Sequence, residues 1–297
     1  TVLHTKNGGR VWSPQRSGVS TLLMGVEFVD SQKGWAVGRG EIIIRTEDAG
    51  KSWEVTRQTA MSVDINGQCF VNELEGWKVG AEGVIFKTVD GGFTMSRQES
   101  GTLRDLSDVA CVNSRSGWSV GRNGTILRTL DGGETWQSSQ SGTTVHLWDV
   151  AFVDEQIGYA VGDNGTILYT EDGGVNWSSQ SVSAMSLYGI NLIDKEIGWA
   201  VGSEGATLMT VDGGVTWGTQ ESGTTATLHS VFFTNRDIGW AVGEQGTVIK
   251  TEDGGETWAR RSSSTDSDLL DVSFVDEKIG WAVGTNGNLI KSSDGGS

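Results

Sequence analysis

Histidine, cysteine and long apolar runs are scarce in this sequence, and each scarcity removes a class of function. The 297 residues include three histidines, His4, His146 and His229, which are too few and too dispersed for a zinc site. Two cysteines, Cys69 and Cys111, cannot supply a disulfide scaffold. No apolar run is long enough to cross a membrane as a helix, so direct membrane insertion is not expected.

Basic residues are also in deficit. Lys and Arg total 22 against 38 Asp and Glu, which gives a net charge of −16. Nucleic acid and anionic membranes need a basic face, so neither is an expected partner. No glycine-rich stretch continues into the Gly-Lys-Ser/Thr of a phosphate loop, and we expect no cofactor and no metal. Residues 1–12 lack the zones of a signal peptide, so this chain shows no targeting segment.

Glycine and tryptophan, in contrast, are abundant and periodic. The 44 glycines and 13 tryptophans include seven copies of a Gly-Trp/Tyr-x-Val-Gly phrase, spaced by 42, 41, 41, 40, 41 and 41 residues. A period near 40 with short strands is typical of a propeller blade. The sequence therefore predicts an all-β fold, a seven-bladed β-propeller of four-stranded blades. We expect one domain over 1–297, with repeats that start near 20, 62, 103, 144, 184, 225 and 266.

The fourth repeat illustrates the expected blade. Strands are predicted at 147–154, 158–162 and 166–170, with a fourth beginning at Trp177. Asn164-Gly165 between the second and third strands supplies the positive φ angles of a tight hairpin.

A second phrase follows the third strand and resembles the Asp-box, Ser/Thr-x-Asp-x-Gly-x-Thr-Trp. Its aspartate can accept backbone N–H groups of its own turn, and the preceding threonine can close the ring. The carboxylates are then occupied, so we interpret them as structural, neither catalytic nor metal-binding. They are Asp48, Asp90, Asp131, Asp172, Asp212 and Asp253.

Twelve of the thirteen tryptophans fall in these two phrases, and Trp148 is the exception. Tyr159 replaces one tryptophan of the first phrase, and Met95 replaces one of the second. Because aromatic side chains bury large areas, the repeated tryptophans are expected to pack the blades together.

The last repeat ends before its fourth strand. We expect the N-terminus to supply that strand, around Arg10–Ser13, so that residues 1–19 complete the last blade and close the ring. Both ends of the sequence also carry a third-strand pattern, and one of the two is redundant. It should fray, or it indicates a longer parent protein.

Function is expected where the repeats differ. One position of the first strand is aliphatic in every repeat, and the next one varies from serine to tryptophan, so it should face the mouth of the central channel. Three successive repeats place aromatic rings there, flanked by the loops 140–146 and 221–229. We predict that Trp148, Tyr188 and His229 form a partner-binding arc; the alternative is that they only fill a wide channel mouth.

In its Gly-Trp and Asp-box phrases, the sequence resembles the bacterial and plastid family of photosystem II stability/assembly factor-like propellers. The resemblance covers essentially the whole chain. It implies a non-enzymatic, extracytoplasmic protein that binds membrane-protein subunits during assembly, through an arginine-rich face in photosynthetic members. Here only Arg39 and Arg122 follow the Val-Gly of their repeats, and Ala81, Asp163, Ser203, Glu244 and Thr285 hold that position elsewhere. We expect a protein partner, such as a membrane-protein subunit, and a monomer.

Two alternatives stay open. Asp-boxes also occur in sialidases and endoglucanases, so a secreted glycan binder or glycoside hydrolase is possible, with Asp108, Asp149 and Asp271 in one column as candidate acids. A short polar residue there more often caps a backbone group, so we predict no enzyme. The third interpretation is a structural repeat segment of a larger surface protein.

Cys69 and Cys111 occupy adjacent columns of adjacent repeats. Their side chains could meet or point apart, and we favour two buried free thiols over a disulfide. A disulfide would indicate an oxidising compartment.

Overall fold

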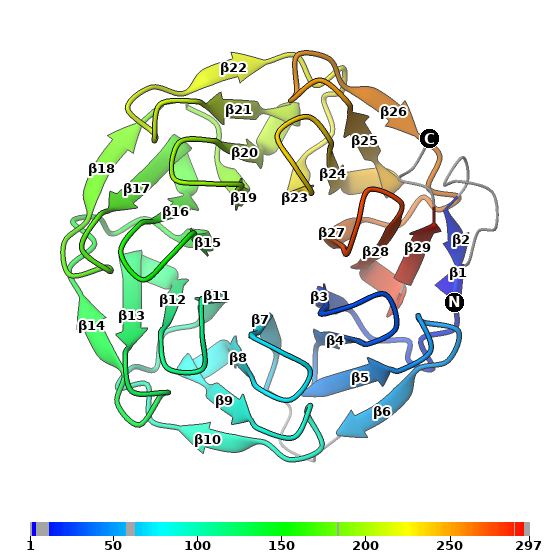
Figure 1. Ribbon diagram of the computed structural model, residues 1–297, viewed down its shortest axis with the longest axis horizontal. Coiled ribbons are helices and arrows are strands. Elements are labelled where there is room, and N and C mark those ends of the chain that lie inside the picture. Colours follow the sequence, from blue (N-terminus) through cyan, green and yellow to red (C-terminus); the bar gives the residue numbers. More distant parts are fainter. Residues whose placement is uncertain (1, 4–11, 58–62, 183, 288, 294–297) are drawn as a thin grey trace.

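The computed structural model describes residues 2–3, 12–57, 63–182, 184–287 and 289–293. Seven sheets stand radially around a central channel, each with its first strand innermost (Figure 1). This confirms the predicted seven-bladed propeller of four-stranded antiparallel blades.

The blades follow one another in chain order, and blades 1 to 4 have these strands: β3 (Leu23–Phe28), β4 (Gly34–Gly38), β5 (Ile42–Thr46) and β6 (Glu54–Arg57); β7 (Ile65–Phe70), β8 (Gly76–Gly80), β9 (Ile85–Thr88) and β10 (Ser96–Gln98); β11 (Leu106–Cys111), β12 (Gly117–Gly121), β13 (Thr125–Thr129) and β14 (Gln137–Ser139); β15 (Leu147–Phe152), β16 (Gly158–Gly162), β17 (Thr166–Thr170) and β18 (Ser178–Ser181). Blades 5 to 7 have β19 (Leu187–Leu192), β20 (Gly198–Gly202), β21 (Thr207–Thr210) and β22 (Gly218–Gln220); β23 (Leu228–Phe233), β24 (Gly239–Gly243), β25 (Val248–Thr251) and β26 (Ala259–Arg261); β27 (Leu269–Phe274), β28 (Ile279–Gly284) and β29 (Leu289–Ser293). Short 3₁₀ turns link the second and third strands of blades 2 to 7: η1 (Ala81–Gly83), η2 (Arg122–Gly124), η3 (Asp163–Gly165), η4 (Ser203–Gly205), η5 (Glu244–Gly246) and η6 (Thr285–Gly287).

The hairpin between the second and third strands needs a left-handed backbone, as the sequence predicts. In blade 4, Asn164 has φ 58° and Gly165 has φ 65°. The glycine that opens the Gly-Trp phrase is needed for a different reason, which is close packing. A Cβ atom on Gly34 would lie 2.6 Å from the ring of Phe28, so only glycine leaves room for that ring.

Each Asp-box closes on itself. In blade 3, Asp131 accepts hydrogen bonds from the Thr129 hydroxyl at 2.8 Å and from the Thr135 backbone and hydroxyl at 3.0 and 2.6 Å. The bonds from Thr135 and Thr129 lower the pKa of Asp131 to about 2. The structural interpretation of the six box aspartates is therefore supported, because their carboxylates are already engaged.

The Gly-Trp tryptophans join neighbouring blades by stacking and by hydrogen bonding. Trp35 of blade 1 stacks on Phe70 of blade 2, with ring centroids 4.0 Å apart, and donates its indole N–H to the Gly91 carbonyl at 2.7 Å. Tyr159 keeps the hydrogen bond, because its hydroxyl donates to the Gly213 carbonyl at 2.6 Å. The other Trp–Phe stacks are Trp118–Phe152, Trp199–Phe233, Trp240–Phe274 and Trp281–Phe28.

The junction of blades 2 and 3 lacks this stack, because Cys111 stands where five other blades have phenylalanine and blade 5 has Leu192. Cys69 and Cys111 instead form a disulfide between β7 and β11. The preference for free thiols was therefore wrong. The two side chains meet because Cys69, the fifth residue of β7, faces Cys111, the sixth residue of β11. An alignment of the repeats does not show which residues of neighbouring strands face each other.

The N-terminal segment closes the ring. β2 (Ser13–Pro14) pairs antiparallel with β29 and takes the place of the missing fourth strand. Trp12 is fully buried against blade 7. The predicted closure is confirmed; of the expected span, Arg10 and Val11 lie outside the described residues. β1 (Val2–Leu3) also pairs with β29, in parallel.

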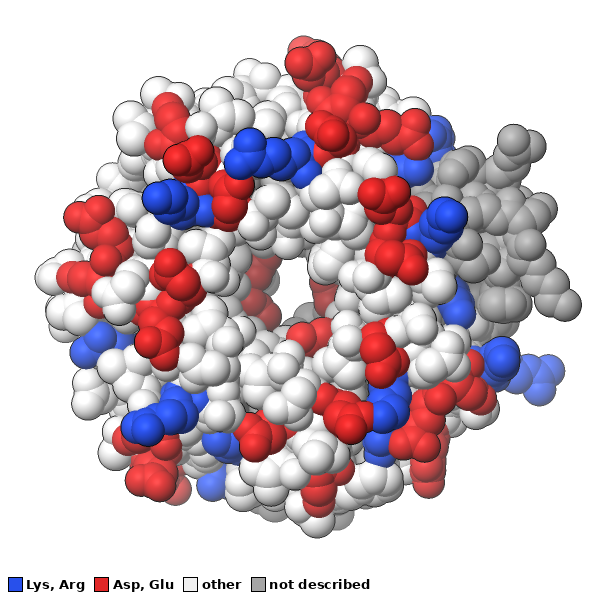
Figure 2. Space-filling model, viewed as in Figure 1, with Lys and Arg blue, Asp and Glu red and all other residues white. Residues whose placement is uncertain are grey.

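In the view of Figure 1 the hairpins that join the first and second strands of each blade lie in front. Figure 2 shows this face, where acidic and basic side chains are interspersed around an open channel. Among the described residues, no helix has the length and apolar character needed to span a membrane.

Candidate binding site at the channel mouth

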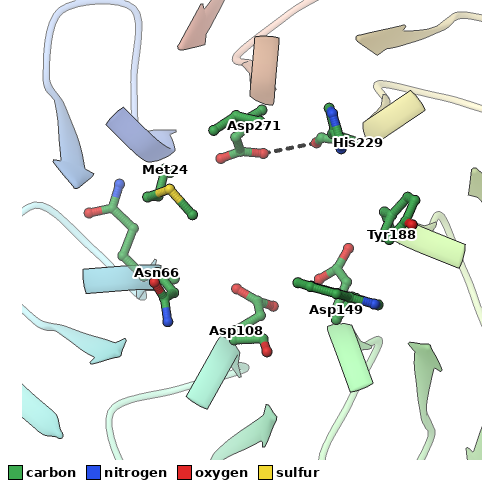
Figure 3. Close-up of a pocket in the computed structure, with 14 residues that line it drawn as sticks. Met24, Asn66, Asp108, Asp149, Tyr188, His229 and Asp271 are labelled. Carbon is green, nitrogen blue, oxygen red and sulfur yellow. Dashed lines mark hydrogen bonds between the residues drawn. The ribbon is translucent and has the colours of Figure 1, made fainter. Parts of the chain in front are cut away.

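A cavity of about 120 Å³ opens at the channel end opposite the face in Figure 2, beside the turns η1 to η6. The first strands of all seven blades contribute to it, each through its second residue and six of them also through the third (Figure 3). The lining residues are Met24, Gly25, Asn66, Gly67, Gln68, Ser107, Asp108, Trp148, Asp149, Tyr188, His229, Ser230, Leu270 and Asp271.

The three aromatic residues predicted as a binding arc lie side by side. The ring of Tyr188 is 5.4 Å from that of Trp148, at 72°, and 5.8 Å from that of His229. Trp148 is 36% exposed, whereas the repeated tryptophans lie between the blades. Its indole N–H donates to the Asp163 carboxylate at 2.8 Å, which fixes the ring at the rim. Their placement at the mouth thus follows the expectation, and their role in binding stays a prediction.

His146 is a fourth member of the arc, and sequence reasoning missed it. Its ring stacks on Trp148 with centroids 3.8 Å apart, and its Nε2 lies 2.7 Å from the Ser107 hydroxyl. Burial lowers the pKa of both His146 and His229, which favours neutral rings. The sequence feature that could have identified His146 is its position at the end of the loop 140–146, directly before Leu147 of the aliphatic column.

Below the arc, three aspartates from the third position of the first strands point into the channel (Figure 3). Each accepts the backbone N–H of the next blade: Asp149 from Ile190 at 2.7 Å, and Asp271 from Val26 at 2.8 Å. Asp108 makes a longer contact of 3.4 Å with the Val150 N–H. As the sequence interpretation proposed, they cap backbone groups, and they do so across blade boundaries.

These aspartates are costly to ionise. Burial raises the pKa of Asp271 to about 7. Burial and the neighbouring Asp149 raise the pKa of Asp108 well above its usual range, and burial also raises the pKa of Asp149. Asp108 and Asp149 lie within hydrogen-bonding reach of each other, so they favour one shared proton.

The two rim arginines are neutralised locally. Arg122 pairs with Asp105 at 2.9 Å, and Arg39 approaches Asp64 at 3.4 Å. They lie in blades 3 and 1, so they form no continuous basic face. Within the described part of the chain, no group of three His, Cys, Asp or Glu side chains has the geometry to hold a metal ion.

Fold and site together define an Asp-box propeller with an aromatic, acidic channel mouth. The family model described as photosynthesis system II assembly factor YCF48 matches residues 4–102, 139–188 and 181–262, which is more than half of the chain. The protein belongs to this family.

One curated relative is the chloroplastic photosystem II stability/assembly factor HCF136 of Oryza sativa subsp. japonica. It is 37% identical over 60 residues, which are 18% of this chain and only 14% of that protein. The matched segment therefore spans a small part of the relative's length.

Solved structures share the fold. "YCF48 bound to D1 peptide" has a TM-score of 0.81 at 19% identity, covering 98% of this chain and 97% of that one. YCF48 from Cyanidioschyzon merolae has a TM-score of 0.77 at 21% identity, covering 92% and 96%. The GH74 enzyme of Niastella koreensis has a TM-score of 0.73 at 15% identity, covering 91% of this chain and 52% of that one.

Proposed function

We propose that this protein is a non-enzymatic binding propeller that assists the assembly of a membrane protein, and that Trp148, Tyr188 and His229 form its contact surface. The observation that carries the proposal is the aromatic arc itself: three adjacent blades place aromatic rings at a half-exposed position where the other blades have Met24, Asn66, Ser107 and Leu270. Exposed aromatic clusters of this kind are typical anchors of protein contacts.

Family membership supports the protein partner. The family is described as one of assembly factors, and one structurally similar member was solved with a peptide of D1. The action proposed here is that of a monomer outside the cytoplasm. The Cys69–Cys111 disulfide supports that location, because such bonds persist in oxidising compartments.

The channel carboxylates do not suit glycoside hydrolysis. Hydrolases of this kind hold two carboxyl groups about 5 to 9.5 Å apart, with substrate between them. Here Asp108 and Asp149 lie within hydrogen-bonding reach of each other and face backbone N–H groups of the next blade. This arrangement favours the binding function over the hydrolase alternative.

The test is affinity capture from the envelope fraction of the source organism, with the wild type and Trp148→Ala/Tyr188→Ala. We expect the wild type to capture one membrane protein, and we expect the variant to capture at least tenfold less of it. The control is Phe93→Ala/Val215→Ala, which removes exposed apolar side chains from the outer rim, 58% and 74% exposed. Equal capture by both variants would refute the site. Binding to a glycan array with no captured protein would favour the glycan-binding alternative.

A further inference from the structure

The cavity at the mouth combines two features that restrict what can enter it. Its volume is small, about 120 Å³, which suits the end of one side chain. Its fourteen lining residues, all within the described chain, include three aspartates and no lysine or arginine.

The rim of the arc is acidic as well. Asp163 holds the Trp148 indole, while Glu244 and Asp268 lie close enough to His229 to oppose the lowering of its pKa. Among the described side chains whose charge shifts the pKa of His146 or His229, the one basic group is Arg122, and it is paired with Asp105. The electrostatic field at the arc is therefore negative and attracts cations.

The geometry of the rings favours a compact cation over a flat sugar. One face of Trp148 is covered by His146 at 3.8 Å, and Tyr188 stands at 72° to the indole. Two aromatic walls at such an angle form a corner, which suits an ammonium or guanidinium group that contacts both π systems. A sugar ring needs one open, flat aromatic face, and the corner restricts it.

We propose that the channel mouth binds one cationic side chain, a lysine or arginine of the partner polypeptide, against Trp148 and Tyr188 and within the negative field of the rim carboxylates. This inference rests on the proposed function, whose contact surface it shares. It assigns the chemistry of the partner segment: an extended, basic stretch that lies across blades 4 to 6 and inserts one long side chain.

The probe is the peptide acetyl-Gly-Gly-Arg-Gly-Gly-amide, compared with the same peptide containing citrulline, which keeps the shape and removes the charge. Binding is followed by the NMR signal of the Trp148 indole N–H, assigned with Trp148→Phe. We expect the arginine peptide to bind at least about fivefold more tightly than the citrulline peptide at low salt. Equal affinities, or no shift of the Trp148 signal, would overturn the inference.

Charge variants of the full protein test the carboxylates. Asp163→Asn/Glu244→Gln should weaken the binding of the arginine peptide severalfold. The matched control, Glu196→Gln/Asp237→Asn, removes the same charge from exposed residues in the hairpins at the other end of the channel and should leave binding unchanged. Equal weakening by both pairs would reduce the effect to net charge and contradict a local site. If 1 mM calcium chloride displaces the peptide at constant ionic strength, an inorganic cation site is the better assignment.

This experiment and the capture experiment can fail separately. If the arginine peptide does not bind but capture still depends on Trp148 and Tyr188, the arc is a contact surface for another chemistry. If capture is also independent of them, both proposals fail.

Discussion

At the scale of single residues, the informative positions are those where one blade departs from the others. The third position of the first strand is glycine in blades 1, 2 and 5, and aspartate in blades 3, 4 and 7. The sequence identifies this column and its capping role, but not its energetics. Desolvation depends on how closely the blades converge, and that distance is not encoded in any one repeat.

Asp271 gives the first prediction. Its folded pKa of about 7 exceeds the unfolded value of about 4, so the folded state retains a proton that the unfolded state loses between these values. Its contribution to stability is therefore fully present below about pH 4 and is lost as the pH rises toward 7. In Asp271→Asn this loss disappears. The difference in unfolding free energy, wild type minus variant, should fall by about 1.4 kcal/mol per pH unit across pH 5 to 6.5, then level off.

Urea unfolding of both proteins at half-unit steps from pH 4 to 9 measures this difference. His146 and His229 titrate in both proteins, so their contributions largely cancel. Asp108, Asp149 and Glu27 interact electrostatically with Asp271, so the measured slope also contains the change in their pKa values. A difference that stays constant with pH would show that Asp271 is ionised throughout this range.

At the scale of elements, the junctions between blades share one design with two exceptions. Five junctions have a Trp–Phe stack, Tyr159 meets Leu192 at the junction of blades 4 and 5, and the disulfide stands at the junction of blades 2 and 3. The two cysteines are 42 residues apart in sequence. Asn191 and Phe233, which meet across the junction of blades 5 and 6, have the same separation, and there the Asn191 side chain accepts the Phe233 N–H.

The periodic phrases were sufficient to predict the strands, hairpins and Asp-boxes, since each depends on residues near one another in sequence. In blade 4, for example, the second and third strands have the predicted bounds. The disulfide was missed because it depends on the offset between neighbouring blades, whereas His146 was missed because it lies in the loop before its strand, outside the aligned columns. The offset between blades is one residue beyond the repeat length, and only the structure establishes it.

The second prediction concerns this junction. Cys69→Ala/Cys111→Ala should lower the free energy of unfolding by about 2 to 4 kcal/mol, because the loop of 42 residues is no longer constrained. Cys69→Ala/Cys111→Phe should recover part of that loss, because Trp77 then gains the stacking partner of the other junctions. Urea unfolding with and without dithiothreitol compares them. The reductant should affect only the wild type, and equal stability of the two variants would contradict the stacking argument.

At the scale of the whole molecule, the ring is held shut by a short, non-covalent closure. The residues after Trp12 reinforce β2: the Gln15 N–H donates to the Leu289 carbonyl at 3.3 Å, and the Ser17 hydroxyl to the Gly287 carbonyl at 3.1 Å. The seven blades otherwise bury their inner strands between neighbours, so a break at blade 7 would expose two blade faces together.

Trp12 and Trp258 offer a matched comparison for this closure. Trp12 packs edge-on against Phe274, with ring centroids 5.9 Å apart at 90°, and Trp258 packs against Phe233 at 5.8 Å and 89°. Replacing the fully buried Trp12 by alanine should cost about 3 to 5 kcal/mol of unfolding free energy, and replacing the partly buried Trp258 should cost less. The two losses differ in their consequences, because Trp258 lies inside a blade that is continuous in sequence and Trp12 holds the strand that closes the ring.

We therefore expect Trp12→Ala, unlike Trp258→Ala, to open blade 7 before the rest of the molecule unfolds. Amide hydrogen exchange in β29 should accelerate by at least about tenfold more in Trp12→Ala than in Trp258→Ala, while exchange in β12 and β16, on the other side of the ring, changes equally in both. Uniform acceleration around the ring in Trp12→Ala would mean that the propeller unfolds as one unit. The N-terminal strand would then contribute only its share of packing, and closure would not control the order in which the blades separate.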